Sequence, residues 1–483
     1  MSLLGDIVFR SRHGRENRVY PFSSSIFTGS FVLIESLSII LIGLAVQTIL
    51  IGWSSEVAEY YVSATFFIFL ATIMLLHFAG QYQFDALMKP VENIDKIVVA
   101  CITAFFLLLA IAFSLKVSDT YSRKWMYIFA FSSTFAIVSY RIIGSWILSQ
   151  LSSKGILARN IVVLGAGVQA ERFLARVCED RPPFMAVMGV FNVEGDRNGS
   201  IEGYPLRGGL EDLVEYVRGH DVDDIVVAHP WNDEERLIPL VERLLELPTT
   251  IYFASDLVGF RFNLRPADNN FAVLPVLEIV EKPLSGWSFV AKYLEDRILS
   301  LLLLIVLSPV FLLTAIAIKI DSPGPIFYRQ RRFGFNNRSF SIYKFRSMHT
   351  KQPASGTTRQ ATANDPRVTR VGHFIRRTSI DELPQLFNVL NGTMSLVGPR
   401  PHAVDHNEEY SKRIRGYFAR HRVKPGITGW AQANGLRGET ANLSKMEARV
   451  RHDLYYAQNW SLLFDLQILL MTALIVIRGK NAY

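Results

Sequence analysis

Residues 298–318 read ILSLLLLIVLSPVFLLTAIAI, an uncharged apolar run of 21 residues with Ser308-Pro309 at its centre. As a helix it would be about 32 Å long, which is enough to cross a bilayer. A proline removes a backbone hydrogen bond and bends a helix. Basic residues flank both ends of the run: Lys292, Arg297, Lys319, Arg329, Arg331 and Arg332. Because basic flanks favour one side of a membrane, we predict a re-entrant helix that bends at Ser308-Pro309; a kinked full span is the alternative.

Four more apolar stretches of membrane-spanning length precede this run, within residues 31–150. They are Phe31–Gly52, Tyr61–Gly80, Ile97–Leu115 and Tyr127–Leu148. The first is too long for a cleavable signal peptide and has no small-residue cleavage site. Lys and Arg mark the cytoplasmic side of a membrane protein. With the arm 1–30 on the cytoplasmic side, eight Lys and Arg of the arm and the short loops lie on that side and three on the other, so we predict a cytoplasmic N-terminus. Glu35 and Arg141 lie inside two stretches, where they could pair, although snorkelling to the interface is the simpler interpretation.

Composition supports a membrane protein with a basic C-terminal part. Of the 483 residues, 50% are hydrophobic and 19% are charged, which excludes intrinsic disorder. From residue 319 onward, 26 Lys and Arg stand against 11 Asp and Glu, a net charge of +15, whereas the rest has a net charge of −7. Such a basic part implies an anionic partner. The two cysteines, Cys101 and Cys178, cannot build a disulfide framework or a four-cysteine zinc site.

Strands and helices alternate over residues 155–282, which predicts a Rossmann-like α/β domain with a parallel sheet. Its first strand leads into Gly165-Ala-Gly167-Val-Gln-Ala170, a turn that could hold a pyrophosphate at a helix N-terminus. Asn192-Val-Glu194 follows the second strand, where a dinucleotide-binding protein usually has an acid directly at the strand end. Nucleotide binding at Gly165 and Gly167 therefore stays a weak hypothesis beside an ordinary tight turn.

Asp381-Glu382 is the strongest candidate for chemistry in the domain that we expect at residues 290–483. Ser379 and Glu382 fit a capping box, but Pro384 would then occupy a helical position that needs an amide. With Asp381 as the N-cap, Pro384 falls in the first turn, where proline is tolerated. Either way, the carboxylates would lie at the positive end of a helix beside Arg376 and Arg377, which would keep them ionised.

Further cations lie on a predicted strand and on rigid loops of the same domain. Lys344 and Arg346 fall on one face of an alternating strand, and Arg400 and Lys424 lie in loops rich in glycine and proline, a composition that suits phosphate recognition. Ordinary turns that bind no phosphate would have the same glycine- and proline-rich sequence pattern. His402 and His406 have helix-face metal spacing without a third ligand, so we expect no metal site there.

Several of these motifs, in this order, resemble the bacterial polyprenyl-phosphate hexose-1-phosphate transferases, the monotopic phosphoglycosyl transferases. The matching segments are Ser308-Pro309, Lys344-Phe-Arg346-Ser-Met, Asp365-Pro-Arg367-Val-Thr-Arg370-Val-Gly372, Thr378-Ser-Ile-Asp381-Glu382-Leu-Pro384-Gln, Ser395-Leu-Val-Gly398-Pro-Arg400-Pro401 and Lys424-Pro-Gly-Ile-Thr-Gly-Trp430. The four spans and the α/β insert resemble the large members, such as undecaprenyl-phosphate glucose phosphotransferases.

The resemblance implies transfer of hexose 1-phosphate, with glucose the expected sugar, from a UDP-hexose to undecaprenyl phosphate, which initiates exopolysaccharide, capsule or O-antigen synthesis. It implies that Asp381 forms a phosphosugar-aspartyl intermediate and that Glu382 binds Mg²⁺. We infer separately that the cations bind phosphate: Lys344, Arg346, Arg376, Arg377, Arg400 and Lys424. The expected partners are UDP-hexose, undecaprenyl phosphate and the lipid bilayer, without nucleic acid, and a homodimer stays open.

The expected location is the bacterial inner membrane, with several spans and the catalytic domain on the cytoplasmic face. Two other classes stay open. A membrane-anchored NDP-sugar oxidoreductase or dehydratase would use the α/β domain, but no tyrosine here has a lysine four residues later, as such enzymes require. A non-catalytic assembly scaffold would not need the carboxylate-and-cation set.

Overall fold

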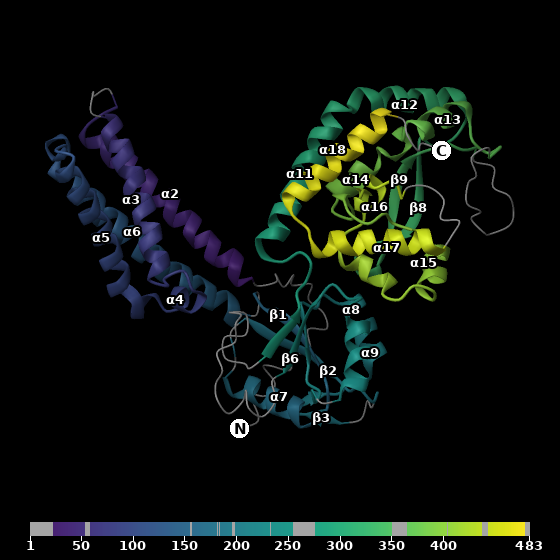
Figure 1. The fold of residues 1–483 in the computed structure, drawn as a ribbon, viewed down its shortest axis with the longest axis horizontal. Coiled ribbons are helices and arrows are strands. Elements are labelled where there is room, and N and C mark those ends of the chain that lie inside the picture. Colours follow the sequence, from purple (N-terminus) through teal and green to yellow (C-terminus); the bar gives the residue numbers. More distant parts are fainter. Residues whose placement is uncertain are drawn as a thin grey trace. The chain divides into compact units, whose positions relative to one another are not determined.

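The computed structural model describes residues 23–53, 58–154, 157–180, 182, 184–195, 199–231, 233–254, 276–349, 365–402, 404–436 and 443–478 (Figure 1). Most of the predicted arm 1–30, with its four arginines, lies outside these residues. Contacts divide the chain into two compact units. The first contains the N-terminal helices, and the second contains most of the α/β sheet together with the C-terminal domain.

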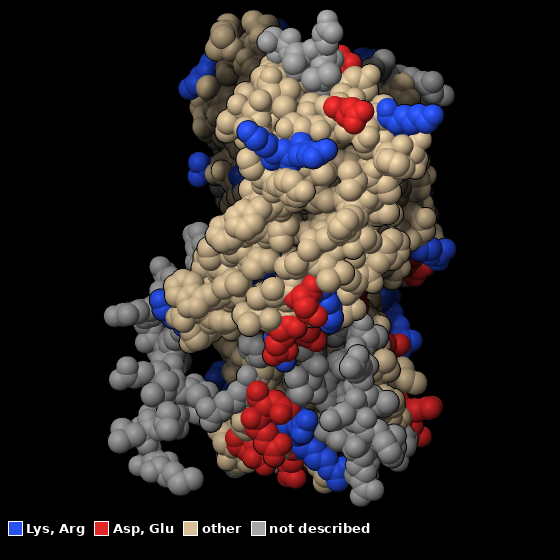
Figure 2. All heavy atoms as spheres, turned by 90° about the vertical axis from the view of Figure 1, so that its left-hand side faces the viewer, with Lys and Arg blue, Asp and Glu red and all other residues tan. Residues whose placement is uncertain are grey.

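The N-terminal unit is built on four long helices: α2 (Ser24–Leu50), α3 (Ala58–Phe78), α5 (Ile94–Ser114) and α6 (Arg123–Ser153). The short α4 (Phe84–Met88) and two 3₁₀ turns, η1 (Pro90–Asn93) and η2 (Ser118–Thr120), connect them. The four long helices, α5 together with η1, are long and apolar enough to cross a membrane, as the sequence predicted. Figure 2 shows an uncharged band of surface between charged side chains at either end. Such a band matches the hydrocarbon core of a bilayer.

Glu35 and Arg141 pair inside this helix bundle. Nε and Nη2 of Arg141 donate to the two carboxylate oxygens of Glu35 at 2.6 and 2.9 Å, and both side chains are fully buried. The hydroxyl of Tyr82 also donates to Glu35, at 2.8 Å. The snorkelling interpretation was therefore wrong, because each charge has a buried partner that satisfies it without reaching the interface.

The α/β region contains a five-stranded sheet in the order β2-β1-β5-β6-β7. Its elements are β1 (Arg159–Leu164), α7 (Val168–Asp180), β2 (Met185–Phe191), α8 (Leu210–Gly219), β5 (Asp224–Val227), α9 (Glu234–Leu244), β6 (Thr250–Ala254) and β7 (Val276–Val280). A small hairpin, β3 (Ser200–Ile201) and β4 (Tyr204–Pro205), precedes α8. β5 and β6 are parallel, and β7 adds an antiparallel edge. The predicted alternation of strands and helices is confirmed.

The C-terminal domain begins with a bent pair of apolar helices, α11 (Gly286–Val306) and α12 (Ser308–Asp321), which meet at 60°. Leu307 lies between them, and Pro309 occupies the first turn of α12, where its missing amide costs no helical hydrogen bond. The predicted break at Ser308-Pro309 is confirmed, although the first helix starts twelve residues before Ile298. Many apolar side chains of the pair are exposed, including Val306 (71%), Leu313 (68%) and Ile320 (82%).

The remaining elements surround a core of their own. They are β8 (Phe327–Phe333), η4 (Phe335–Asn337), β9 (Ser339–Phe345), α13 (Arg370–Arg377), η5 (Ile380–Glu382), α14 (Gln385–Leu390), β10 (Ser395–Val397), α15 (Val404–Ser411), η6 (Tyr417–Arg422), β11 (Gly426–Thr428), α16 (Trp430–Ala433), α17 (Leu443–Gln458) and α18 (Leu462–Arg478). β8 and β9 form an antiparallel hairpin, and β10 pairs in parallel with β11. The core joins α14, β10 and α17 through Leu386, Leu396 and Tyr456.

Candidate active site

Asp381 and Glu382 lie in the 3₁₀ turn η5, immediately before α14. Ser379 adopts a left-handed conformation (φ 59°), which turns the chain sharply after α13. Pro384 then occupies the N-cap position of α14. Both expected capping arrangements were therefore wrong: the amide of Glu382 donates to the backbone carbonyl of Ser379, and Asp381 precedes the helix that it was expected to cap.

Two cations hold the Glu382 carboxylate. Nζ of Lys344, on β9, donates to Oε1 at 2.9 Å. Arg400 donates through Nη2 to Oε1 at 2.6 Å and through Nη1 to Oε2 at 3.1 Å, the two-point geometry that suits a guanidinium and a carboxylate. Burial by itself would raise the pKa of Glu382, but the charges of Arg400 and Lys344 outweigh it and hold that pKa well below its ordinary value. Glu382 is therefore a fixed anion at neutral pH.

Asp381 has the opposite character. Burial, and after it the negative charge of Glu382, raises the pKa of Asp381 to about 6, although Lys344, Arg376 and Arg400 act against this. We expected Arg376 and Arg377 to keep both carboxylates ionised, but the cations that act on Glu382 are Arg400 and Lys344, and the pKa of Asp381 is raised. A half-buried carboxyl with a shifted pKa beside a fixed anion is typical of catalytic pairs. It can act as a nucleophile near pH 7, since most of it is ionised there.

The other predicted cations do not all join this pair. Arg376 is half-buried and its charge acts on Asp381, whereas Arg377 is exposed. Arg346 instead donates to the carbonyls of Pro323 (2.5 Å) and Ser322 (2.7 Å), in the segment directly after α12. Lys424 is half-buried, and the charges that act on it are those of Asp296, Arg297 and Lys292.

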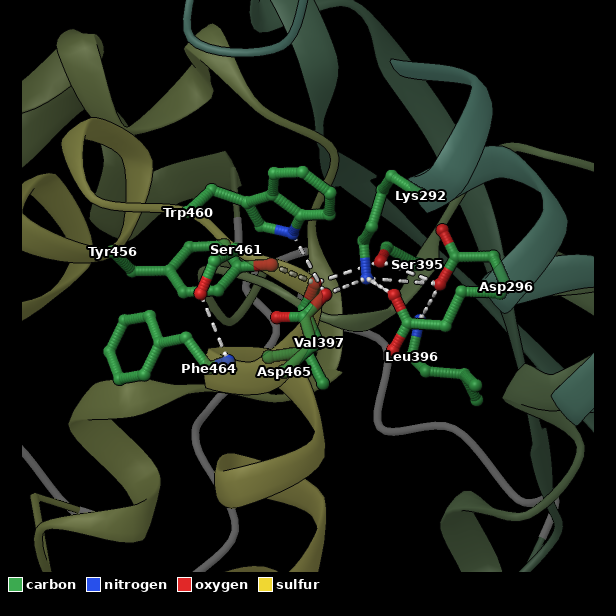
Figure 3. A network of polar contacts seen from close by, with 11 residues as sticks. Lys292, Asp296, Ser395, Leu396, Val397, Tyr456, Trp460, Ser461, Phe464 and Asp465 are labelled. Carbon is green, nitrogen blue, oxygen red and sulfur yellow. Dashed lines mark hydrogen bonds and ion pairs between the residues drawn. The ribbon is translucent and has the colours of Figure 1, made fainter. Parts of the chain in front are cut away.

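A second buried network, which we did not predict, connects α11 with α18 (Figure 3). Nζ of Lys292 lies 2.6 Å from Asp465 Oδ2, 3.2 Å from Asp296 Oδ1 and 3.5 Å from Glu295 Oε2. Asp296 also accepts hydrogen bonds from the hydroxyl of Ser395 and the amide of Leu396, both at 2.9 Å. Lys292, which we counted among the basic flanks of the apolar run, is therefore buried in an ion-pair network. The signal was Asp465, a lone acid near the start of an apolar helix, which requires a buried partner.

In the α/β domain, Gly165 has a structural explanation. It has φ +144°, and a Cβ placed there would lie 2.1 Å from the carbonyl oxygen of Ala228, so the close approach of two strand ends requires glycine. A Cβ at Gly167 would meet open space. Packing therefore explains one of the two glycines, and the nucleotide-binding hypothesis rests on Gly167 alone.

Comparison with known proteins identifies the family. Residues 287–479 match the bacterial sugar transferase family model, and residues 77–255 match a CoA-binding domain model. A UDP-glucose:undecaprenyl-phosphate glucose-1-phosphate transferase of Xanthomonas campestris pv. campestris is 37% identical over 376 residues, 77% of this chain and 78% of the relative. The chain belongs to the bacterial sugar transferase family.

Two further relatives have the same name. The protein of Escherichia coli K12 is 40% identical over 76% of this chain and 77% of its own length. That of Klebsiella pneumoniae is 44% identical over 61% of this chain and 63% of its own length. This sugar transferase thus has its carboxylate pair inside the matched segment, and the resemblance predicted from the motifs is confirmed.

Proposed function

We propose that this protein transfers glucose 1-phosphate from UDP-glucose to undecaprenyl phosphate and releases UMP, as the initiating step of exopolysaccharide, capsule or O-antigen synthesis. The substrates are those named for the three relatives. The observation that carries the mechanism is the unequal carboxylate pair, in which Glu382 is a fixed anion and the pKa of Asp381 lies at about 6.

In the first step, a carboxylate oxygen of Asp381 attacks the sugar-linked phosphorus of UDP-glucose. The bond from that phosphorus to the bridging oxygen breaks, and UMP leaves with the oxygen and the electron pair. A glucosyl-phosphate group is then bound to Asp381 as an acyl phosphate. In the second step, a phosphate oxygen of undecaprenyl phosphate attacks the same phosphorus and releases the Asp381 carboxylate. Such a covalent intermediate divides one difficult transfer into two easier ones.

The residues fit the expected Mg²⁺. Mg²⁺ is usually held by one or two carboxylates together with substrate phosphates, and Glu382, one residue after the proposed nucleophile, offers such a carboxylate. Among the residues that the structure describes, no group of three or more His, Cys, Asp or Glu side chains could hold a metal ion. When bound, Mg²⁺ would neutralise charge on the diphosphate. Arg400 and Lys344 would orient the Glu382 carboxylate, and Arg376 would add positive charge near the attacked phosphate.

We also propose that the bent pair α11–α12 enters and leaves the bilayer on its cytoplasmic face, so that the soluble donor and the prenyl lipid meet at the interface. The 60° bend and the exposed apolar side chains support this arrangement. Single cysteines at the exposed Ser288 and Ser339, in a chain without Cys101 and Cys178, should both react only from the cytoplasmic side. Labelling of Ser339→Cys from the periplasmic side would contradict re-entry.

Incubation of the protein with UDP-glucose alone tests the reaction. We expect release of about one UMP per active site and a hydroxylamine-sensitive glucosyl phosphate on Asp381, as a double-displacement mechanism requires. Asp381→Asn should abolish both, while Arg377→Gln, at an exposed position of the adjacent helix, is the matched control and should retain the burst. Normal turnover by the Asp381→Asn protein would refute the proposed nucleophile.

A further inference from the structure

Arg400 reaches Glu382 from a segment that is itself held from behind. The segment follows β10 and reads Gly398-Pro399-Arg400-Pro401-His402, and the prolines restrict the backbone on both sides of Arg400. Even so, a guanidinium can bind a carboxylate at two points only if the backbone that carries it keeps a fixed direction. The described contacts show that Arg420, in η6, supplies this support.

The guanidinium of Arg420 contacts the segment on both sides of Pro401. Its Nη2 donates to the carbonyl of Arg400 at 2.7 Å, and its Nη1 lies 2.5 Å from Nδ1 of His402. Burial, and after it the charge of Arg420, holds the pKa of His402 well below its ordinary value, so the imidazole is neutral and one ring nitrogen can accept. The hydroxyl of Tyr417 lies 2.6 Å from the same ring nitrogen.

Arg420 is in turn fixed by a buried ion pair. Its Nη2 lies 2.7 Å from Oδ2 of Asp453, on α17, and the two side chains are 1% and 2% exposed. A buried pair of this kind contributes little net stability compared with an apolar pair of the same volume, so its use is better sought in what it holds in place. Here it holds the backbone carbonyl of the residue whose side chain neutralises Glu382.

We propose that Arg420, anchored by Asp453, is a positioning residue of the active site, which acts by directing Arg400 onto Glu382. The inference rests on the proposed function, in which Glu382 works beside the nucleophile. The order of contacts is Asp453 to Arg420, Arg420 to the Arg400 backbone, and Arg400 to Glu382. Arg420 touches neither carboxylate of the pair in these contacts and has no direct part in the chemistry.

Arg449 provides a matched control. It lies on α17, one turn before Asp453, and is also mostly buried. Its charge also acts on Arg420, Asp453 and Arg400, and a lysine keeps that charge. The hydrogen bonds of its fork differ, however: Nε and Nη2 donate to the carbonyl of Leu436, at 3.1 and 2.7 Å, which is a different backbone segment. Arg420→Lys and Arg449→Lys each keep the positive charge and remove the planar fork of donors. A purely structural role predicts similar effects for the two variants.

The test uses the full-length protein in membranes, with the rate of UMP release divided by the burst amplitude, which counts folded active sites. Arg420→Lys should lower this rate about tenfold, and Arg449→Lys less than about twofold. In a protein that already carries Arg400→Lys, Arg420→Lys should lower the rate by less than about a further twofold. Arg420 is proposed to act through the guanidinium of Arg400, and that guanidinium is then absent. Equal losses of rate in Arg420→Lys and Arg449→Lys would overturn the proposal. It would also be overturned if the losses from Arg420→Lys and Arg400→Lys were fully additive in the double variant.

A second variant is needed because the lysine of Arg420→Lys could still donate to the carbonyl of Arg400. Arg420→Gln/Asp453→Asn removes both charges together and leaves neither partner of the pair as an unpaired buried ion, so it should fold and should show at least the same loss of rate. A normal rate in this double variant would overturn the proposal. If Asp381→Asn turns over normally, the proposed function fails instead, and a loss confined to the Arg420 variants would still show that Arg420 supports the site.

Discussion

Removal of the Lys292 charge should destabilise the C-terminal domain more than almost any other single substitution in it. Lys292 is the central cation of a buried cluster with Asp465, Asp296 and Glu295, and its side chain is 7% exposed. Lys292→Met keeps most of the apolar stem and leaves three carboxylates without their cation. Breaking one buried ion pair costs about 3–5 kcal/mol because an uncompensated charge remains.

For a domain of this size, each kcal/mol corresponds to roughly 2–4 °C in Tm, so Lys292→Met should lower Tm by roughly 6–20 °C. We would follow thermal unfolding of the detergent-solubilised protein by circular dichroism at a single heating rate, because unfolding of membrane proteins is often irreversible. Lys292→Met/Asp465→Asn should recover at least half of the loss, since asparagine can still accept from Nε1 of Trp460, which lies 2.9 Å from Asp465 Oδ2.

Arg413→Met is the control for this experiment. Arg413 pairs with Glu409 at 3.3 Å, but the two side chains are 58% and 51% exposed. Exposed pairs contribute less than about 1 kcal/mol, so Tm should change by only a few degrees. A Lys292→Met protein that unfolds within 2 °C of the unmodified protein would refute the reasoning, because the carboxylates would then have to be neutral.

The UMP burst should weaken as pH falls through about 6, because burial and the charge of Glu382 raise the pKa of Asp381 to about that value. The ionised fraction of Asp381 then drops from roughly nine-tenths at pH 7 to roughly one-tenth at pH 5. Gly165→Ala should destabilise the α/β domain by roughly 3 kcal/mol or more, because its Cβ would meet the Ala228 carbonyl, whereas Gly167→Ala should be nearly neutral in the same thermal unfolding experiment. Arg141→Met should reduce the yield of folded protein, and Arg141→Met/Glu35→Met should restore it, measured by size-exclusion chromatography. A UMP burst that does not change between pH 7 and pH 5 would contradict the first expectation. Equal destabilisation by Gly165→Ala and Gly167→Ala would contradict the second, and a yield of Arg141→Met/Glu35→Met no higher than that of Arg141→Met would contradict the third.

Features that depend on neighbouring residues were predictable from the sequence. The four long helices follow from runs of apolar residues, and the break after Leu307 follows from the chemistry of Pro309. The α/β alternation is likewise a local pattern. In contrast, the pairing of Glu35 with Arg141 joins residues 106 positions apart, and that of Lys292 with Asp465 joins residues 173 positions apart. Their sequence showed charges in apolar surroundings, but only the fold shows which partner each one has.

The candidate active site has features of both kinds, local in sequence and dependent on the fold. The motif around Asp381 and Glu382 is local, and it identified the carboxylate pair, but the difference between the two acids arises from residues that the fold brings in. Lys344 lies 38 positions before Glu382 on β9, and Arg400 lies 18 positions after it in the loop that follows β10. Both cations pair with Glu382, so its carboxylate stays charged. Burial, and after it this negative charge, raises the pKa of Asp381.

This arrangement explains why the pair needs its cations on one side. If Lys344 and Arg400 were shared equally, both carboxylates would be strongly stabilised anions, and the attacking one would lose basicity and nucleophilicity. With both cations on Glu382, Asp381 keeps a pKa of about 6 and remains mostly ionised near pH 7. In the proposed mechanism, the direction of the Arg400 side chain would therefore affect the reactivity of Asp381, and so would the support of the Arg400 backbone by Arg420.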